Sequence, residues 1–234
     1  MTLPRVPLPW IEVVAATRLP KSGFWAKTAL GQSLQRISAD RRVSSFTSFE
    51  NRSGLPRFYN QRIETDGPDV LVFAHDDVWL DDYHFAQRLL DGLDAFDVVG
   101  VAGNRRRVAR QPAWAFLDMN LTVDSPDNLS GAVAHGSAPF GAVTYYGVYP
   151  APASCELLDG MLLATRRSTL VKSGVRFDPR FAFHFYDMDF CRSARQAGMR
   201  LGTWPLSVTH QSSGAFGSAP WREGYERYIE KWGD

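Results

Sequence analysis

The chain lacks the features that would assign it to several common classes of protein. Its 234 residues contain two cysteines, Cys155 and Cys191, which belong to no CxxC pair, so neither a zinc knuckle nor a disulfide framework is indicated. No apolar run approaches the ~20 residues that cross a bilayer, and the N-terminal segment has no apolar stretch of signal-peptide length. These absences predict a cytoplasmic protein without a transmembrane segment.

A strong net charge is also missing. The 26 basic and 25 acidic residues leave a formal charge of +1, so there is no global field to attract a nucleic acid or an anionic membrane. No P-loop or glycine-rich nucleotidyl motif lies near the first predicted strand. What is present is a hydrophobic content of 44%, enough for a sizeable core, and any anion that binds must be held by local groups.

Strand and helix patterns alternate over the first hundred residues. We expect strands at 10–16, 41–50, 69–75 and 95–103, with helices at 21–37, 54–64 and 81–93 between them. The segment 104–155 shows no helical period and is expected to be irregular. Beyond it we expect a strand and helix in 156–170, a helix at 187–198, a strand at 201–210 and a tail helix at 221–232. The pattern predicts an α/β fold with a mostly parallel sheet flanked by helices.

Two adjacent carboxylates, Asp76 and Asp77, follow the apolar strand "VLVFA". In open α/β sheets, ligands bind at the carboxyl ends of the strands. Two neighbouring carboxylates repel each other unless a cation lies beside them, and Mg²⁺ or Mn²⁺ bridging substrate phosphates is the usual solution. The pair therefore predicts a divalent-metal site, although capping of the next helix would also explain it.

Four further acidic or imidazole groups are predicted near the same edge of the sheet. Asp187 and Asp189 begin a helix, where an ionised carboxylate is favoured and can act as a general base or as a simple cap. Asp159 and His210 each follow a predicted strand. Neutral imidazole is a good ligand for first-row metal ions, so His210 is a candidate to complete the metal site, with a purely structural role as the alternative.

The segments "VFAHDDV", "GAVAHG", "LLDGMLL", "FYDMDFCRSARQAG", "VTH" and "YERYIEKW" together resemble the GT-A glycosyltransferases. The likeness is to the family-2-like branch related to streptomycin-biosynthesis-type proteins, and it covers residues ~10 to 232. It implies a nucleotide-diphospho-sugar transferase of Rossmann-like fold, with one domain over 1–234. Residues 10–103 would form the nucleotide-binding half and residues 104–234 the acceptor-binding and catalytic half.

The resemblance also implies roles for individual residues. Asp77 and His210 correspond to the metal ligands, Asp187 to the catalytic base, and Asp76, Asp159 and Gly160 to contacts with the donor. The nucleotide is expected against the ends of the first two strands. The residues there are Thr17, Arg18, Glu50, Asn51 and Asn60.

Two positions depart from the family pattern. The usual Asp-x-Asp is His75-Asp76-Asp77 here, so the first carboxylate is missing, and Tyr186 occupies the place of the Glu that normally precedes the base. These departures keep two alternatives open beside an inverting, Mn²⁺- or Mg²⁺-assisted glycosyltransferase that uses a UDP-sugar by analogy. One is a metal-dependent nucleotidyltransferase or phosphohydrolase. The other is a non-catalytic sugar-nucleotide-binding module.

The acceptor, a glycan or a small molecule, is expected under the segment 104–155, because loops on a rigid scaffold carry specificity. Four aromatic residues of that segment are candidates to stack on it: Trp114, Tyr145, Tyr146 and Tyr149.

Overall fold

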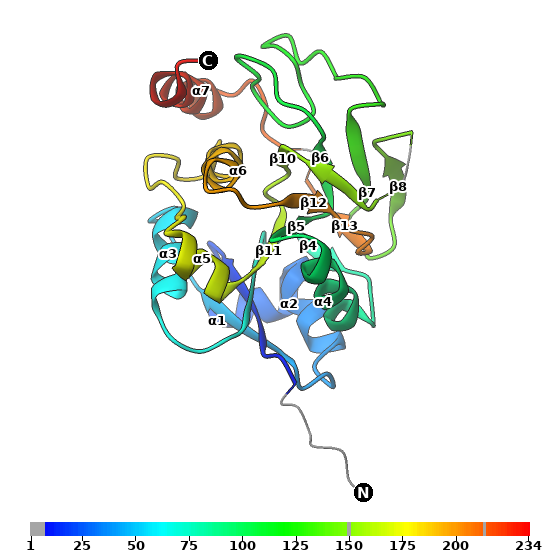
Figure 1. Cartoon of the computed structure of the whole chain (residues 1–234). Helices are drawn as coiled ribbons and strands as arrows, with labels where there is room; N and C mark the ends of the chain where they lie inside the picture. The colour runs from blue at the N-terminus through cyan, green and yellow to red at the C-terminus, as the bar shows by residue number, and fades with distance from the viewer. Residues whose placement is uncertain (1–7, 149–150, 213) are drawn as a thin grey trace, which may run out of the picture.

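A seven-stranded sheet lies at the centre of the computed structural model, which describes residues 8–148, 151–212 and 214–234 (Figure 1). Its strands lie in the order β2-β1-β3-β11-β5-β12-β9. In that order they are β2 (Val43–Ser48), β1 (Ile11–Ala16), β3 (Val70–Ala74), β11 (Leu162–Arg166), β5 (Val98–Gly100), β12 (Leu201–Thr203) and β9 (Ala153–Cys155).

The sheet is mixed, and five of its seven strands run in one direction, in keeping with the expected mostly parallel sheet. Strand β1 runs parallel to β2 and β3, and β5 runs parallel to β12. Strand β11, however, is inserted antiparallel between β3 and β5, and β9 is antiparallel to β12. The alternation of strands and helices in residues 10–103 gave no sign that a strand from the second half of the chain would enter between them.

A second sheet of six short strands lies beside the first. Its order is β10-β6-β7-β13-β4, and β8 pairs with β7 outside this path. The strands are β10 (Leu157–Leu158), β6 (Ala102–Asn104), β7 (Leu129–His135), β13 (Val208–His210), β4 (Val78–Leu80) and β8 (Ala142–Tyr145). The predicted strands 95–103 and 201–210 are therefore each divided between the two sheets.

Strands β7, β8 and β9 also correct the prediction that 104–155 is irregular. Strand β7 has the sequence "LSGAVAH", whose small residues carry little of the β-branched signal on which strand prediction depends. At Gly131 the structure leaves no room for a side chain. Its φ is 107°, and a Cβ atom there would collide with the carbonyl oxygen of Val101 on the neighbouring segment.

Helices cover both sides of the central strands. In Figure 1, α3 and α5 lie on one side of β11, and α2 and α4 lie on the other. The helices are α1 (Lys21–Lys27), α2 (Ala29–Arg36), α3 (Leu55–Glu64), α4 (Phe85–Ala95), α5 (Arg167–Ser173), α6 (Tyr186–Gln196) and α7 (Ala219–Trp232). The predicted helix 21–37 is two helices, because Thr28 is extended and its side chain caps α2 by accepting from the backbone N–H of Gly31.

Strand β3 is buried along its whole length, as its continuous apolar sequence predicted. It belongs to the large sheet, whereas β4, which begins at Val78, belongs to the second sheet. Residues 75–77 therefore join the two sheets. No helix within the described ranges has the length and apolar character needed to cross a membrane.

Candidate active site

The connection between the two sheets is anchored through its backbone by three different parts of the chain. The backbone N–H of His75 donates to the carbonyl of Met161, and the carbonyls of Asp76 and Asp77 accept from the backbone N–H groups of Leu30 and Gln211 at 3.1 and 3.0 Å. A simple turn would need no such anchoring. It fixes the direction of three consecutive titratable side chains.

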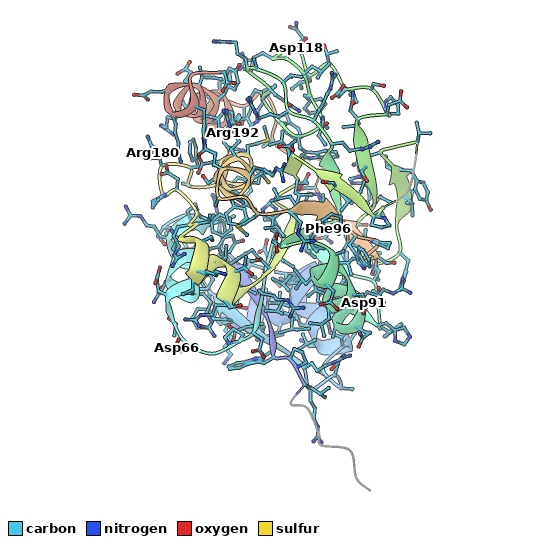
Figure 2. The ribbon with its side chains drawn as sticks, in the orientation of Figure 1. Asp66, Asp91, Phe96, Asp118, Arg180 and Arg192 are labelled. Atoms are coloured by element: carbon cyan, nitrogen blue, oxygen red, sulfur yellow. The ribbon has the colours of Figure 1, made fainter. Side chains whose placement is uncertain are left out.

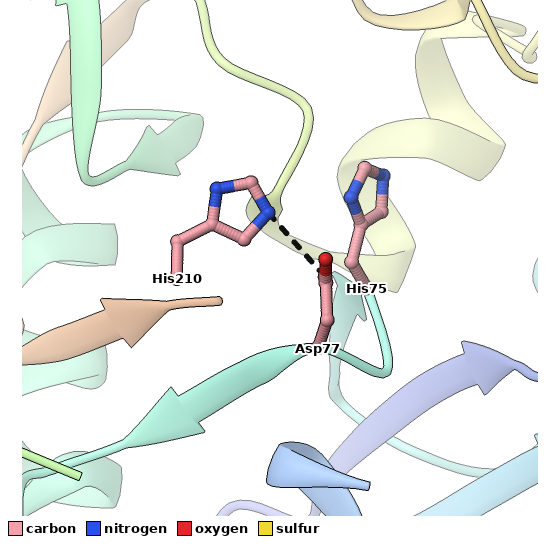
Figure 3. Close-up of side chains that lie close together, drawn as sticks. All are labelled: His75, Asp77 and His210. Carbon is pink, nitrogen blue, oxygen red and sulfur yellow. Dashed lines mark ion pairs between the residues drawn. The ribbon is translucent and has the colours of Figure 1, made fainter. Parts of the chain in front are cut away.

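His75, Asp77 and His210 form a compact cluster at this connection (Figure 3). One potential ligand atom from each residue lies within 4.8 Å of the others, and Nε2 of His210 is 3.3 Å from Oδ1 of Asp77. Burial works against ionisation of Asp77, but the contact with His210 outweighs it and lowers the pKa of Asp77 to about 2. The Asp77 carboxylate is therefore ionised at neutral pH.

His75 is held in one orientation by the hydroxyl of Tyr186. This hydroxyl donates to the carbonyl of Gly160 at 2.6 Å and lies 2.8 Å from Nε2 of His75. Because a carbonyl can only accept, the Tyr186 hydroxyl accepts in turn from the Nε2–H of His75. Burial lowers the pKa of His75, so its ring is neutral and keeps the lone pair on Nδ1. Figure 3 shows that one ring nitrogen of His75 faces Asp77 and His210.

His75 was not predicted as a ligand from the sequence, because its position was taken as that of a missing carboxylate. The signal that points to it is chemical. Imidazole is a common metal ligand, and His75 lies only two residues from the predicted ligand Asp77. The partner that orients it, Tyr186, was counted as a departure from the family pattern.

Asp187 lies in the first turn of α6 and contacts the turn after β10. Its Oδ2 accepts a 3.0 Å hydrogen bond from the backbone N–H of Gly160. Burial, together with the negative charge of Asp159, raises the pKa of Asp187 to about 7. Gly160 must lack a side chain, since a Cβ atom would lie 2.6 Å from the hydroxyl oxygen of Tyr186 and 2.8 Å from Cβ of Asp187.

Asp159 is oriented by the segment that follows β6. Its Oδ2 accepts a 2.6 Å hydrogen bond from the indole N–H of Trp114, and its Oδ1 accepts from the backbone N–H of Met161. Trp114 thus connects the segment 104–155, which was predicted to cover the acceptor, with Asp159, which was predicted to contact the donor.

Asp189, the other carboxylate of the α6 start, points away from this group. It is fully buried and contacts Nζ of Lys231 at 2.6 Å and the indole N–H of Trp232 at 2.9 Å. Arg192 of α6, which is labelled in Figure 2, makes a 2.7 Å contact with Asp234, two residues after the end of α7. The alternative that Asp189 acts as the base therefore does not fit, because its carboxylate anchors α7.

The predicted nucleotide contacts lie near the end of β1. Thr17 is buried, and its hydroxyl accepts a 3.2 Å hydrogen bond from the backbone N–H of Leu19. The pKa of nearby Asp76 is raised by burial. Arg18 and Glu50 are exposed, whereas Asn51 bonds within its own loop to Ser53 and Gly54.

Asn60 lies apart from these residues. Its side-chain amide donates to the carbonyl of Phe177 and accepts from the N–H of the same residue, so it fixes the loop before α6.

One cavity of about 750 Å³ brings most of the predicted site together. Six of the residues singled out from the sequence line it: Asp76, Asp77, Asp159, Gly160, Asp187 and His210. Trp114 and Tyr146 line it as well, whereas Tyr145 is 70% exposed and Tyr149 lies outside the described residues. The other predicted nucleotide contacts, Thr17, Arg18, Glu50, Asn51 and Asn60, are not among the lining residues. No lysine or arginine lines the cavity in the part of the chain that is described.

The protein is thus a mixed α/β protein with a group of carboxylates and imidazoles at its strand ends. Comparison with known proteins identifies its family. Residues 25–221 match a family model described as "Glycosyltransferase like family". The chain belongs to this family. No curated protein matches it.

Solved structures support the fold. One similar structure is GalNAc-T7 with UDP, GalNAc and Mn²⁺, which is 15% identical with a TM-score of 0.53; the match covers 97% of this chain and 49% of that one. Another is the catalytic domain of Drosophila beta1,4galactosyltransferase 7 with xylobiose, at 10% identity and a TM-score of 0.51, covering 94% and 80%. The chain thus spans about half the length of the GalNAc-T7 chain and has the GT-A glycosyltransferase fold. Its particular branch stays a prediction.

Proposed function

We propose that the chain is an inverting glycosyltransferase that moves a sugar from a nucleoside-diphosphate sugar to an acceptor hydroxyl. The observation that carries this proposal is the presence, in one cavity, of a carboxylate with a pKa of about 7, Asp187, and of the His75, Asp77 and His210 cluster. A group that titrates near neutral pH suits general-base catalysis. The cluster suits a cation that binds phosphates.

The cluster fits a divalent metal ion. Oδ1 of Asp77 is buried and, apart from its ion pair with His210, has no hydrogen-bond partner among the described residues, which suits a metal ligand. Two imidazoles and one carboxylate favour Mn²⁺ or another first-row ion over Mg²⁺, which prefers oxygen ligands. The related GalNAc-T7 structure contains Mn²⁺ and UDP. When bound, such an ion neutralises the charge that develops on the leaving diphosphate.

The carboxylate of Asp187 would take the proton from the acceptor hydroxyl. The acceptor oxygen then forms a bond to the anomeric carbon from the face opposite the diphosphate, as the bond from that carbon to the diphosphate oxygen breaks. A single displacement of this kind inverts the configuration at the anomeric carbon. With a pKa of about 7, a large share of Asp187 is ionised at neutral pH and yet basic enough to accept the proton.

The lining residues divide the cavity into a donor side and an acceptor side. Ala16, Leu55 and Asp76 belong to the predicted nucleotide-binding half, so we assign the nucleotide to that side, near Thr17. Asp159 and Gly160 also line the cavity, and Gly160 is hydrogen-bonded to Asp187, so we assign the contacts with the donor sugar to these two residues. The remaining predicted contacts, Arg18, Glu50, Asn51 and Asn60, have no such support from the cavity lining.

A thermal-shift panel with UDP, GDP and dTDP, each with MnCl₂ or with EDTA, tests the donor site. A nucleotide that binds only the native state raises the melting temperature, and we expect an increase that requires Mn²⁺ and is largest with UDP. Analysis of the products then separates the functions. Nucleoside diphosphate with an inverted glycoside supports the proposal, and pyrophosphate or inorganic phosphate would indicate the nucleotidyltransferase or phosphohydrolase alternative. Binding without turnover would indicate a sugar-nucleotide-binding module.

A further inference from the structure

Aromatic side chains make up a large part of the cavity lining. They come from three segments that are far apart in the sequence: the loop 112–116, the residues before α6, and the segment that leads into α7. Figure 1 shows the loop after β6 and helix α7 at the end of the molecule opposite α1. We call these six residues the aromatic wall: Trp114, Phe116, Phe183, Phe185, Phe216 and Trp221.

Four rings of the aromatic wall are in contact with one another as a row. Phe116 meets Phe216 edge to face with 5.0 Å between ring centroids, Phe216 meets Trp221 at 6.1 Å, and Trp221 meets Phe185 at 5.6 Å. Phe185 is the N-cap residue of α6, two positions before Asp187. The row therefore runs from the outer loops to the helix end that carries the proposed base.

Parts of this wall are exposed to water. Phe183 is 52% exposed and Phe216 is 39% exposed, and the neighbouring lining residue Val123 is 58% exposed. Large apolar side chains that face a cavity and keep this much contact with water are typical of ligand sites, because a ligand with an apolar face removes that water.

The wall offers few partners for the hydroxyl groups of a sugar. Apart from the carboxylates and the proposed metal ligands, the polar lining side chains are those of Trp114, His135, Tyr146, His184, Tyr186, Ser212 and Trp221. Trp114, Tyr146 and Tyr186 are already bonded to Asp159, His135 and His75, and no asparagine or glutamine lines the cavity among the described residues. A buried hydroxyl without a partner costs about 1–3 kcal/mol. Four carboxylates with no lysine or arginine beside them also repel an anion. An oligosaccharide and an anionic acceptor are both poorly matched to this surface.

We infer that the acceptor is an uncharged alcohol with a planar apolar group, such as an aryl ring, which lies on the aromatic wall and directs its hydroxyl to Asp187. This inference rests on the proposed function, and it narrows the acceptor from any glycan or small molecule to one chemical class. The aryl ring replaces water against Phe216. The hydroxyl reaches the carboxylates and imidazoles at the strand ends and at the start of α6, which we call the floor of the cavity. Polar partners are present there.

Three ligands that differ by one group each test the inference by isothermal titration calorimetry in the presence of UDP and MnCl₂. They are phenyl β-D-glucopyranoside, methyl β-D-glucopyranoside and phenyl β-D-glucuronide. We expect the phenyl glucoside to bind about tenfold more tightly than the methyl glucoside, because the ring buries more apolar surface. The glucuronide is expected to bind about tenfold more weakly than the phenyl glucoside, because its carboxylate faces the acidic floor.

The variants Phe216→Ala and Phe46→Ala form a matched pair. Both side chains are 39% exposed, but Phe46 stacks on Phe58 outside the cavity. Phe216→Ala should remove most of the preference for the phenyl glucoside over the methyl glucoside, and Phe46→Ala should keep it. Equal binding of the phenyl and methyl glucosides to the wild type, or a preference that survives Phe216→Ala, would overturn the inference.

The thermal-shift panel on the same preparation keeps the two proposals apart. A Mn²⁺-dependent shift with a nucleoside diphosphate, together with tighter binding of methyl glucoside or of the glucuronide than of phenyl glucoside, refutes the acceptor class and leaves the donor site intact. Absence of any nucleotide shift refutes the proposed function even where the phenyl glucoside binds.

Discussion

The floor and the wall of the cavity are built in different ways. The floor is a set of carboxylates and imidazoles at strand ends and at a helix start, fixed by backbone hydrogen bonds from α2, from the turn before β11 and from the residue after β13. The wall is a set of aromatic rings on loops and at the start of α7, fixed by contacts with one another. Under the two proposals, the sheets and the start of α6 carry the chemistry, whereas the segments that bear the aromatic rings carry the choice of acceptor.

Removal of the proposed base should have the largest effect. We expect Asp187→Asn to lower kcat for transfer by a factor of about 10²–10⁴, since the acceptor proton loses its carboxylate. Binding of the nucleotide should change little. Initial rates measured at saturating donor, with calorimetry of UDP binding as the control, check this. A variant that keeps more than half the wild-type kcat would contradict the role of Asp187.

The pH dependence sharpens the same assignment. Because the pKa of Asp187 is about 7, the transfer rate should fall about tenfold per pH unit below 7 and level off above it. Stability should change in the opposite direction. The folded protein binds this proton more tightly than the unfolded chain does, so the contribution is present below about pH 4 and is lost as the pH rises through 7.

Melting temperatures at pH 5 and pH 8 test this linkage. Asp187→Asn should melt above the wild type at pH 8, because an ionised carboxylate is no longer held in a site that disfavours its charge, and the difference should be smaller at pH 5. A melting temperature at pH 8 that falls on substitution would show that the ionised Asp187 is stabilised in the fold.

The next effect in size is expected at Tyr186, the residue of α6 that contacts His75 on the floor of the cavity. Tyr186→Phe removes the hydroxyl that orients His75, and loss of such a partner typically costs about 10–100-fold in metal affinity. Titration of Mn²⁺, followed by the loss of its free electron paramagnetic resonance signal, measures the affinity directly. An unchanged dissociation constant would mean that His75 does not depend on Tyr186 or is not a ligand.

The smallest effect on activity is expected at Asp189. Asp189→Asn removes a buried charge partner of Lys231, which keeps its contact with Asp178, and we expect a loss of about 2 kcal/mol in the free energy of unfolding. The transfer rate below the melting temperature should stay within about twofold. Urea denaturation and initial rates check the two parts. This variant is also the control for Asp187→Asn, because both residues lie in the first turn of α6.

The residues of the floor could be predicted from the sequence more readily than the residues of the wall. Asp77, Asp187 and His210 each end or follow a recognisable segment of the sequence. A titratable residue at the end of a strand predicts a binding site, because the ends of neighbouring strands lie at one edge of the sheet. Phe216 and Trp221 carry no such signal, because an aromatic residue in a loop or at a helix start more often packs than binds. Only the three-dimensional contact with Phe116 and Phe185 reveals the row.

The elements of the fold were largely predictable, but their arrangement was not. The apolar pattern of "VLVFA" located β3, and the spacing in "DMDFCRSARQAG" located α6. The insertion of β11 between β3 and β5 depends on contacts between residues more than 60 positions apart, for which local periodicity holds no information. His75 was missed for a related reason, since its partner Tyr186 comes from a distant helix.

Titration of Mn²⁺ and UDP by calorimetry into the wild type and into Asp77→Ala tests the central claim most directly. If the cluster on the floor holds the metal that binds the donor diphosphate, the wild type will bind one Mn²⁺ and will bind UDP only when Mn²⁺ is present. Asp77→Ala will lose both. UDP binding of equal affinity in EDTA, or Mn²⁺ binding that survives Asp77→Ala unchanged, would contradict it.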